Sequence, residues 1–302
     1  MGNCDSVNHL EKESSDDFDE YDDCILPDNM ASKKPISQKY TLIKKIGEGA
    51  TGTVSIGKDK TGKLYAIKSI SKKNIFYCSL SKLIVDEAKI GLKLNHPNLI
   101  KFKEIFEDSK KIHFVMELVN GVDLLNYIKN SPGKKLNDST AIDIIIQILD
   151  GLSYLHNKQH VIHRDIKPAN FLVTVDNNNK PIVKLADFGF AKQFFEGEKL
   201  IEFLGTLDYC APEIISKTPY DQKVDLWAAG VVLYNMLTGC SPFDGENDGK
   251  TKTNILNRNL NFDKIKNQNL KILCMGLLER NSKNRLDVDK ALYLAKCSKK
   301  KY

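Results

Sequence analysis

Four short motifs in a fixed order constrain this chain more than any other feature. GEGATGTV begins at Gly47 and is followed by AIK, which ends at Lys68; HRDIKPAN begins at His163, DFG at Asp187 and APE at Ala211. Each motif alone is weak evidence, but all four in this order and spacing are highly specific. Chance is therefore not a serious explanation of their presence in one chain.

The glycine-rich motif lies in a segment that alternates apolar and polar residues on both sides of the glycines. This alternation predicts a hairpin with a strand over residues 53–56, and a third strand over residues 64–70. A dinucleotide-binding fold would need a helix directly after the glycines, so that alternative is disfavoured. Glycines let the backbone approach phosphates closely, and Lys68 supplies them with a positive charge.

Together the motifs resemble those of the eukaryotic protein kinase family, over residues 40–296. The runs LNHPNLIKF, GTLDYCAPE and DLWAAGVVLYNMLTGCSPF are similar to the calcium/calmodulin-dependent and calcium-dependent kinases. The resemblance implies an α+β, bilobal fold with a five-stranded antiparallel sheet and one helix in the N-lobe and a mainly helical C-lobe. It places the N-lobe at 40–118, the hinge at 119–122 and the C-lobe at 123–296, with an arm at 1–39 and a basic tail at 297–302.

The resemblance also assigns catalytic roles. Phosphoryl transfer depends on positioning and on neutralising phosphate charge. By resemblance, Asp165 accepts or orients the proton of the attacking hydroxyl group and Lys167 lies beside the transferred phosphoryl group, a pattern similar to serine/threonine kinases. Asn170 and Asp187 would hold Mg²⁺ through hard oxygen ligands.

ATP is the second expected cofactor. The resemblance pairs Lys68 with Glu87 to hold the α- and β-phosphates, although Glu87 taken alone is better explained as a solvated residue of an amphipathic helix. The resemblance also implies an apolar sandwich around adenine, a gatekeeper, hinge contacts and an acid at the ribose; plain core packing is the alternative for the apolar members. The expected ATP-binding residues are Ile46, Gly47, Glu48, Gly49, Ala50, Thr51, Gly52, Thr53, Val54, Ala66, Lys68, Glu87, Met116 as gatekeeper, Glu117 and Val119 in the hinge, Asp123 at the ribose, and Leu172.

The activation loop has a carboxylate at an informative position. Glu202 lies three residues before Gly205, where many kinases carry a threonine or serine whose phosphate pairs with the arginine of HRD, here Arg164. Glu202 places a permanent negative charge there, so we expect an activation loop that needs no phosphorylation. Thr206, next along, is expected to help form the floor for the acceptor residue.

Two departures from the family pattern bear on regulation. Gly91 lies four residues after Glu87, where the family usually has a large apolar residue. This predicts lost packing and a loosely held helix, unless Phe102 fills the gap. Calcium-dependent relatives carry EF-hands after the kinase domain; we expect none here, and a calcium sensor acting in trans is a candidate partner.

Charge is unevenly distributed along the 302 residues, which carry a net charge of +6. Residues 1–30 contain ten acidic side chains and one lysine, so the remainder is strongly basic. The acidic block at 13–23 shows no periodicity and predicts that the arm is disordered. The basic remainder has no zinc-finger, homeodomain or aromatic-interleaved signature, so nucleic acid is not an expected partner.

The sequence begins Met-Gly-Asn-Cys-Asp-Ser, which matches the acceptor pattern for N-myristoylation at Gly2 and places Cys4 for S-palmitoylation. Accidental agreement is the alternative. One myristoyl chain binds membranes only marginally, so a second signal is needed. Seven cysteines without close pairs fit a reducing compartment. We therefore expect a cytoplasmic protein held at the inner face of a membrane.

The C-lobe contributes structural expectations. Residues 137–156 carry isoleucines and leucines at helical intervals and predict a long buried helix. By resemblance, Asp225 braces the HRD backbone and Arg285 pairs with Glu213. The expected function is transfer of the γ-phosphate of ATP to hydroxyl groups of protein substrates. The alternative is a pseudokinase-like membrane scaffold, which the complete set of catalytic residues disfavours.

Overall fold

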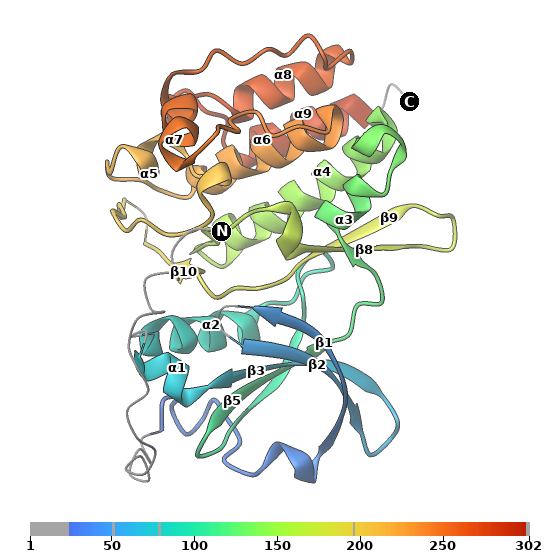
Figure 1. The fold of residues 1–302 in the computed structure, drawn as a ribbon, viewed down its shortest axis with the longest axis vertical. Helices are drawn as coiled ribbons and strands as arrows, with labels where there is room; N and C mark the ends of the chain where they lie inside the picture. The colour runs from blue at the N-terminus through green and yellow to red at the C-terminus, as the bar shows by residue number, and fades with distance from the viewer. Residues whose placement is uncertain (1–23, 50–51, 78–79, 196, 300–302) are drawn as a thin grey trace. The chain divides into compact units, whose positions relative to one another are not determined.

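The computed structural model describes residues 24–49, 52–77, 80–195 and 197–299. The chain divides into two compact units (Figure 1). Unit 1 contains the residues up to Lys93 together with Lys101–Leu118, and unit 2 contains Leu94–Ile100 and the residues from Val119 onward. The expected bilobal α+β fold is confirmed.

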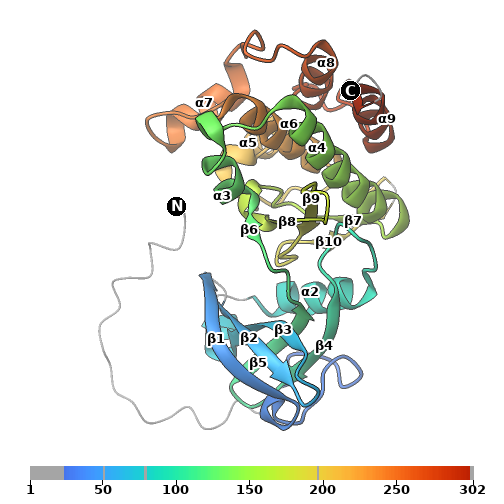
Figure 2. The same ribbon diagram turned by 90° about the vertical axis from the view of Figure 1, so that its right-hand side faces the viewer.

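Unit 1 is built on a five-stranded antiparallel sheet in the order β1-β2-β3-β5-β4 (Figure 2). The glycine-rich segment forms the first hairpin, in which Gly47 lies opposite Val54 and Gly49 opposite Gly52. The predicted hairpin and third strand are confirmed. The strands are β1 Tyr40–Gly49, β2 Gly52–Asp59, β3 Leu64–Ser71, β4 Phe102–Glu107 and β5 Lys111–Glu117.

Among its described residues, unit 1 has two α-helices, α1 Lys72–Tyr77 and α2 Ser81–Lys93, where one was expected. Ile75, which is fully buried, anchors the additional helix α1 directly after β3. Side chains alternate across a strand, so Lys68 of β3 points to the face that carries α2 and Ile67 to the other face. That other face has an apolar core of its own, formed by Ile36, Tyr40, Tyr65, Ile67, Phe106 and Val115.

The expected extent of the arm, residues 1–39, is wrong for residues 24–39. Leu26, Ala31 and Ile36 are buried in unit 1, and a 3₁₀ turn, Ile36–Gln38, leads into β1. These apolar side chains gain enough by burial to order a segment whose average composition is polar. Residues 1–23, including the acidic block, lie outside the described residues.

The expected N-lobe boundary is also wrong for Leu94–Ile100, which belong to unit 2. The Ile100 amide donates to the Leu185 carbonyl at 2.8 Å, and the Leu185 amide donates to the Asn98 carbonyl at 2.8 Å. These backbone bonds attach the segment to strand β9, Pro181–Leu185, of unit 2, a long-range pairing that no local sequence pattern predicts. On the other side, the division between Leu118 and Val119 coincides with the expected start of the hinge.

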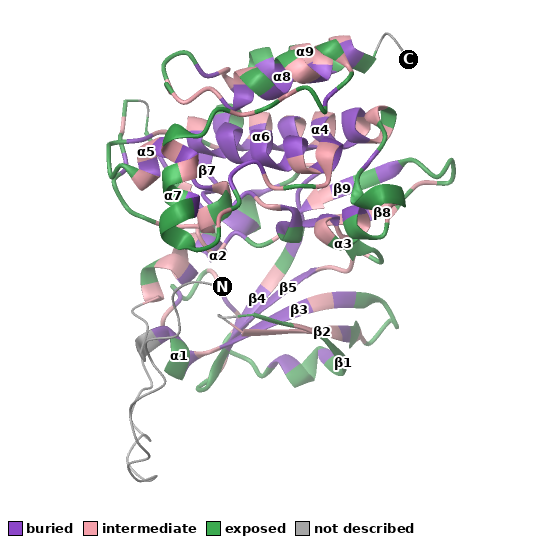
Figure 3. Ribbon diagram, turned by 45° about the horizontal axis from the view of Figure 1, so that its top comes forward, coloured by how far each residue is buried: buried purple, intermediate pink, exposed green. Residues whose placement is uncertain are grey.

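Unit 2 is mainly helical. Helix α6 is buried on nearly all sides, which makes it the central helix of the unit (Figure 3). The predicted long buried helix is α4, which continues into a π-helical turn, Tyr154–Lys158. Among the described residues no helix is both long and apolar enough to cross a bilayer. The helices are α3 Leu124–Lys129, α4 Asp138–Ser153, α5 Pro212–Ile215, α6 Lys223–Thr238, α7 Asp248–Asn257, α8 Gln268–Leu277 and α9 Val288–Lys299.

Short strands complete unit 2 and carry the loops of interest. They form a three-stranded sheet in the order β6-β8-β9 and a two-stranded sheet of β7 and β10. Their bounds are β6 Val122–Asp123, β7 Val161–Ile162, β8 Phe171–Val175, β9 Pro181–Leu185 and β10 Lys192–Gln193. The β8–β9 hairpin lies between the HRDIKPAN and DFG motifs.

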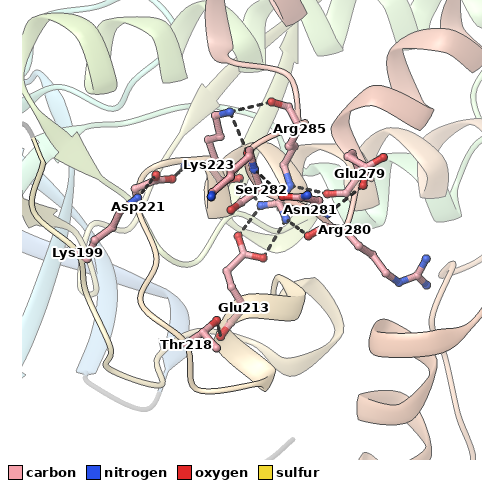
Figure 4. Close-up of polar contacts among 11 residues, drawn as sticks. Lys199, Glu213, Thr218, Asp221, Lys223, Glu279, Arg280, Asn281, Ser282 and Arg285 are labelled. Atoms are coloured by element: carbon pink, nitrogen blue, oxygen red, sulfur yellow. Dashed lines mark hydrogen bonds and ion pairs between the residues drawn. The ribbon is translucent and has the colours of Figure 1, made fainter.

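An ion pair at the base of α5 ties distant parts of unit 2 together (Figure 4). Arg285, only 2% exposed, donates to both carboxylate oxygens of Glu213 at 2.6 and 2.9 Å. It also donates to the backbone carbonyls of Glu279 at 2.8 Å and Lys223 at 3.0 Å. Such a bidentate geometry matches the planar guanidinium group, so lysine could not replace it.

We expect Arg285→Met to lower the free energy of unfolding by about 3–5 kcal/mol, because it leaves Glu213 without its partner. Urea unfolding would measure the loss. The exposed pair of Lys290 and Asp287, 3.2 Å apart, supplies the control, since Lys290→Met should cost about 0–1 kcal/mol. Equal losses in the two variants would contradict this assignment.

Candidate active site

In unit 2 the Asp165 carboxylate is the centre of a polar cluster. Its Oδ1 accepts from the Thr206 hydroxyl at 2.8 Å, and its Oδ2 lies 2.8 Å from Lys167 Nζ and 3.0 Å from Asn170 Nδ2. Lys167 also donates to the Thr206 hydroxyl at 2.8 Å. Asp165 is buried while Lys167 is partly exposed. A base-like carboxylate therefore lies beside a cation, the pair that proton abstraction and phosphate neutralisation require.

A second buried carboxylate, Asp225 in the first turn of α6, holds the backbone before Asp165. It accepts the amides of His163 and Arg164 at 2.9 Å each and pairs with His156 Nε2 at 2.8 Å. Burial tends to raise the pKa of Asp225, but the hydrogen bond and charge of His156 outweigh it and the pKa lies below its usual value. The expected brace of the HRD backbone is thus present in the geometry.

The brace acts where the backbone is strained. Arg164 has a φ of 68° and Asp187 a φ of 66°, a left-handed conformation that costs a non-glycine residue about 1–3 kcal/mol. The two hydrogen bonds from the His163 and Arg164 amides to Asp225 hold the backbone at the strained Arg164. Both strained residues lie in loops, outside the helices and strands of unit 2.

Asn170 and Asp187 offer oxygen ligands suited to a hard cation. The Asn170 amide nitrogen donates to the Asp165 carbonyl at 2.8 Å and to the Asp165 carboxylate at 3.0 Å. These contacts assign the nitrogen side of the amide, so its Oδ1 faces away from Asp165. An amide oxygen and a carboxylate are the ligand types that Mg²⁺ prefers, so the residues fit the ion.

The activation loop is held by Glu202. Arg164 Nη1 donates to its Oε2 at 2.8 Å, and Lys192 Nζ lies 3.4 Å from its Oε1. The Arg164 side chain is 3% exposed and also donates to the Phe190 carbonyl at 2.7 Å. The Tyr220 hydroxyl donates to the Glu202 carbonyl at 2.9 Å. Sequence reasoning had paired only Arg164 with Glu202; Lys192 and Tyr220 lie outside the four motifs, so no motif signal pointed to them.

In unit 1, Lys68 donates to Glu87 at 2.7 Å in a buried ion pair, with the glutamate side chain only 1% exposed. Lys68 comes from β3 and Glu87 from α2. The interpretation of Glu87 as a solvated residue is therefore wrong. A buried pair of this kind fixes the ammonium group in space, which a residue that contacts phosphates requires.

The glycine loop approaches its neighbours closely. At Gly52 a Cβ atom would lie 2.3 Å from the Ser69 carbonyl oxygen, so only glycine fits there. Glu48 forms an ion pair with Lys45 at 2.6 Å. Thr53 lies opposite Glu48 in the hairpin. Ala50 and Thr51, two of the expected ATP-binding residues, lie outside the described residues.

Four of the five apolar residues expected to contact adenine are more exposed than core residues. Ile46 is 48% exposed, and Val54, Ala66 and Leu172 are only partly buried; Met116 alone is buried, at 8%. Core packing would bury all five, so this pattern favours side chains that are available to a ligand.

Some of the polar groups expected to contact the nucleotide form hydrogen bonds within the protein. The amide of Glu117 donates to the Lys101 carbonyl at 2.9 Å, so that amide is not available for adenine. The Val119 carbonyl accepts from the Gly121 amide at 3.2 Å. Asp123 caps α3, where it accepts the Asn126 backbone and side-chain nitrogens at 2.8 and 2.7 Å.

Residues 40–294 match the family model described as "Protein kinase domain". The chain belongs to the protein kinase family. The predicted recognition as a eukaryotic serine/threonine kinase is confirmed at this level. Kinases of this family use ATP and Mg²⁺, as expected.

Individual relatives agree with the family. The kinase is 38% identical to calcium-dependent protein kinase 4 of Plasmodium berghei over 70% of this chain and 40% of that protein. It is 38% identical to an Aurora kinase of Candida glabrata over 82% of this chain and 68% of that protein. It is 35% identical to sperm motility kinase 3A of mouse over 72% of this chain and 42% of that protein. The matched region is thus less than half of the calcium-dependent and sperm motility relatives.

The gap expected at Gly91 is filled in the kinase. A Cβ atom on Gly91 would lie 2.6 Å from two ring atoms of Phe102, so the Phe102 ring occupies the space that a larger side chain would take. Phe102 is 5% exposed and packs edge-to-face on Phe114, with ring centroids 5.7 Å apart. The expected loss of packing is therefore wrong, because an aromatic side chain from β4 supplies it to α2.

We expect Gly91→Ala to destabilise the kinase, although glycine to alanine in a helix normally gains about 1 kcal/mol. The new methyl group would overlap the Phe102 ring, and overpacking costs about 1–3 kcal/mol. Combining it with Phe102→Leu should remove most of that penalty, so the two effects would not add. Thermal unfolding of the single and double variants would test this, and simple additivity would count against the packing.

Proposed function

We propose that this chain is an active serine/threonine protein kinase whose activation loop is competent without phosphorylation. The pairing of Arg164 with Glu202 at 2.8 Å carries the proposal. A carboxylate takes the place that a phosphate takes in kinases switched by loop phosphorylation. Membership of the protein kinase family supports the kinase activity, and the independence from loop phosphorylation is the new part of the proposal.

The sequence of the loop supports the same conclusion. From Phe188 to Gly205 the run FGFAKQFFEGEKLIEFLG contains no serine, threonine or tyrosine. The loop therefore offers no hydroxyl group for phosphorylation before Thr206. Thr206 donates its hydroxyl to Asp165, which commits that residue to the catalytic cluster.

The geometry suits proton transfer and charge neutralisation. Asp165 can accept the proton of an attacking serine or threonine hydroxyl group, and Lys167 can neutralise the phosphoryl oxygens beside it. Lys68, fixed by Glu87, can hold the phosphates of ATP. Asn170 and Asp187 would hold Mg²⁺, which when bound supplies further charge neutralisation.

The pseudokinase alternative loses its main support in this structure. A loosely held helix α2 at Gly91 would have favoured that alternative, but the Phe102 ring fills the space beside Gly91. Lys68, Glu87 and Asp165 all lie in paired, buried arrangements that serve catalysis.

We expect Glu202→Ala to lower kcat by about tenfold, less than the full value of a charge-assisted hydrogen bond because the Glu202 side chain is 46% exposed. Phosphatase treatment of the wild-type kinase should leave its activity intact. Both effects can be read as Mg²⁺-dependent transfer of phosphate from ATP to a generic protein substrate.

Asp187→Asn is the matched control for this assay, because it removes one carboxylate that would hold Mg²⁺. Equal signal from the wild type and Asp187→Asn would refute the enzyme itself. Loss of activity on phosphatase treatment, with Asp187→Asn inactive throughout, would refute only the role of Glu202.

We further propose that the amino terminus is acylated at Gly2 and Cys4 and tethers the kinase to the inner face of a membrane. Both residues lie outside the described residues, and the support is the acceptor pattern alone. Two acyl chains together would anchor stably where one would not. The acidic residues that follow are repelled by anionic lipid, which makes Cys4 the better second signal than surface charge.

Intact-mass measurement of the kinase from eukaryotic cells would test this. We expect loss of Met1 and a myristoyl adduct that Gly2→Ala abolishes, together with a hydroxylamine-sensitive adduct that Cys4→Ser removes. Wild-type protein without either adduct would contradict the proposed tether.

A further inference from the structure

Residues 24–39, here called the strap, lie along the free edge of the unit 1 sheet. Strand β4 is the edge strand of that sheet. Ser32 forms a parallel bridge with Phe106, in which the Ser32 amide donates to the Ile105 carbonyl at 2.9 Å and the Glu107 amide donates to the Ser32 carbonyl at 3.0 Å. The strap thus satisfies backbone groups that an edge strand otherwise leaves unpaired.

A single carboxylate fastens the strap. The Glu107 side chain is 1% exposed and accepts the Ile25 amide at 2.7 Å, the Leu26 amide at 3.2 Å and Lys33 Nζ at 2.7 Å. Its Oε1 also lies 3.0 Å from Nζ of Lys72, the first residue of α1. The same buried group therefore holds both the strap and the start of α1.

The charges make these two attachments depend on each other. Burial tends to raise the pKa of Glu107, but its hydrogen bonds from Lys33, Ile25 and Lys72 outweigh this, so the pKa lies below its usual value and the group stays ionised. When the strap leaves, Glu107 loses three donors and retains Lys72. Water then reaches Glu107, and its ion pair with Lys72 weakens because solvent screens exposed charges, so the position of Lys72 is coupled to the strap.

Lys72 connects this carboxylate to the catalytic pair. It directly follows β3, which carries Lys68. Helix α1 continues toward α2 through hydrogen bonds from the Leu80 amide to the Ile75 carbonyl at 2.9 Å and from the Ile84 amide to the Leu80 carbonyl at 3.0 Å. Helix α2 carries Glu87.

We propose that the strap is a clasp which, through Glu107 and Lys72, holds α1 and α2 in the position that pairs Glu87 with Lys68. Release of the strap then lowers kinase activity. The clasp begins directly after the acidic residues 1–23, so a partner that pulls on or binds that arm would act on α2 through it. The inference rests on the proposed kinase activity but not on acylation.

Hydrogen exchange and kinetics on the full chain would test the clasp. Lys33→Met removes one ion pair and Leu26→Ser removes a buried anchor that is 1% exposed; Lys34→Met changes the neighbouring exposed lysine and is the control. We expect both strap variants to speed exchange in residues 24–39 and in α1 and α2, to leave α4 and α6 unchanged, and to lower kcat/KM for ATP at least about fivefold. The control should match the wild type.

Two outcomes would overturn the clasp. One is a released strap with wild-type exchange in α2 and wild-type kcat/KM. The other is a strap that neither Lys33→Met nor Leu26→Ser releases. An inactive wild-type protein would instead refute the proposed function, and the exchange in α1 and α2 would still decide whether the strap holds these helices.

Discussion

The loop that carries Arg164 and Asp165 depends on its hydrogen bonds to the buried carboxylate of Asp225. This carboxylate holds the amides of His163 and Arg164, at the point where Arg164 adopts a left-handed conformation. One turn of backbone thus aims two side chains with different tasks. Arg164 reaches Glu202 of the activation loop, and Asp165 meets Lys167 and Thr206. Because the same turn positions both side chains, the contact of Arg164 with Glu202 and the placement of Asp165 depend on one another.

Four carboxylates in this kinase are each matched with donors that come from distant parts of the chain. Glu87 meets Lys68, Glu107 meets Lys33 and Lys72, and Glu213 meets Arg285. Asp225 is satisfied mainly by backbone amides and His156. Removing a single partner from such a group leaves a buried charge unpaired, which costs more than the pair contributes. These groups therefore define the arrangement of elements more than they add to net stability.

Local patterns predicted the elements whose signal is local. Alternating apolar residues indicated the first three strands, and the family resemblance indicated partners for Lys68 and Glu202. Residues 24–39 were assigned to the disordered arm because the acidic block at 13–23 lies beside them, whereas the strap depends on single apolar residues such as Leu26 and on Glu107, 81 positions from Leu26. Leu94–Ile100 were misassigned for a related reason, since their partner Leu185 is distant in sequence.

The sequence left two outcomes open at Gly91, and the structure decides between them. Phe102 of β4 fills the space beside Gly91 of α2, which is the alternative to a loosely held helix. Phe102 packs against α2 at this position and Arg164 pairs with Glu202, so we expect control of the kinase at another contact. At the contact between Lys72 of α1 and Glu107, three of the four groups that donate to the carboxylate belong to the strap. The strap pairs with the sheet at its edge strand, so it can be released without unfolding the sheet, and we propose that it is the part of unit 1 that responds to a partner.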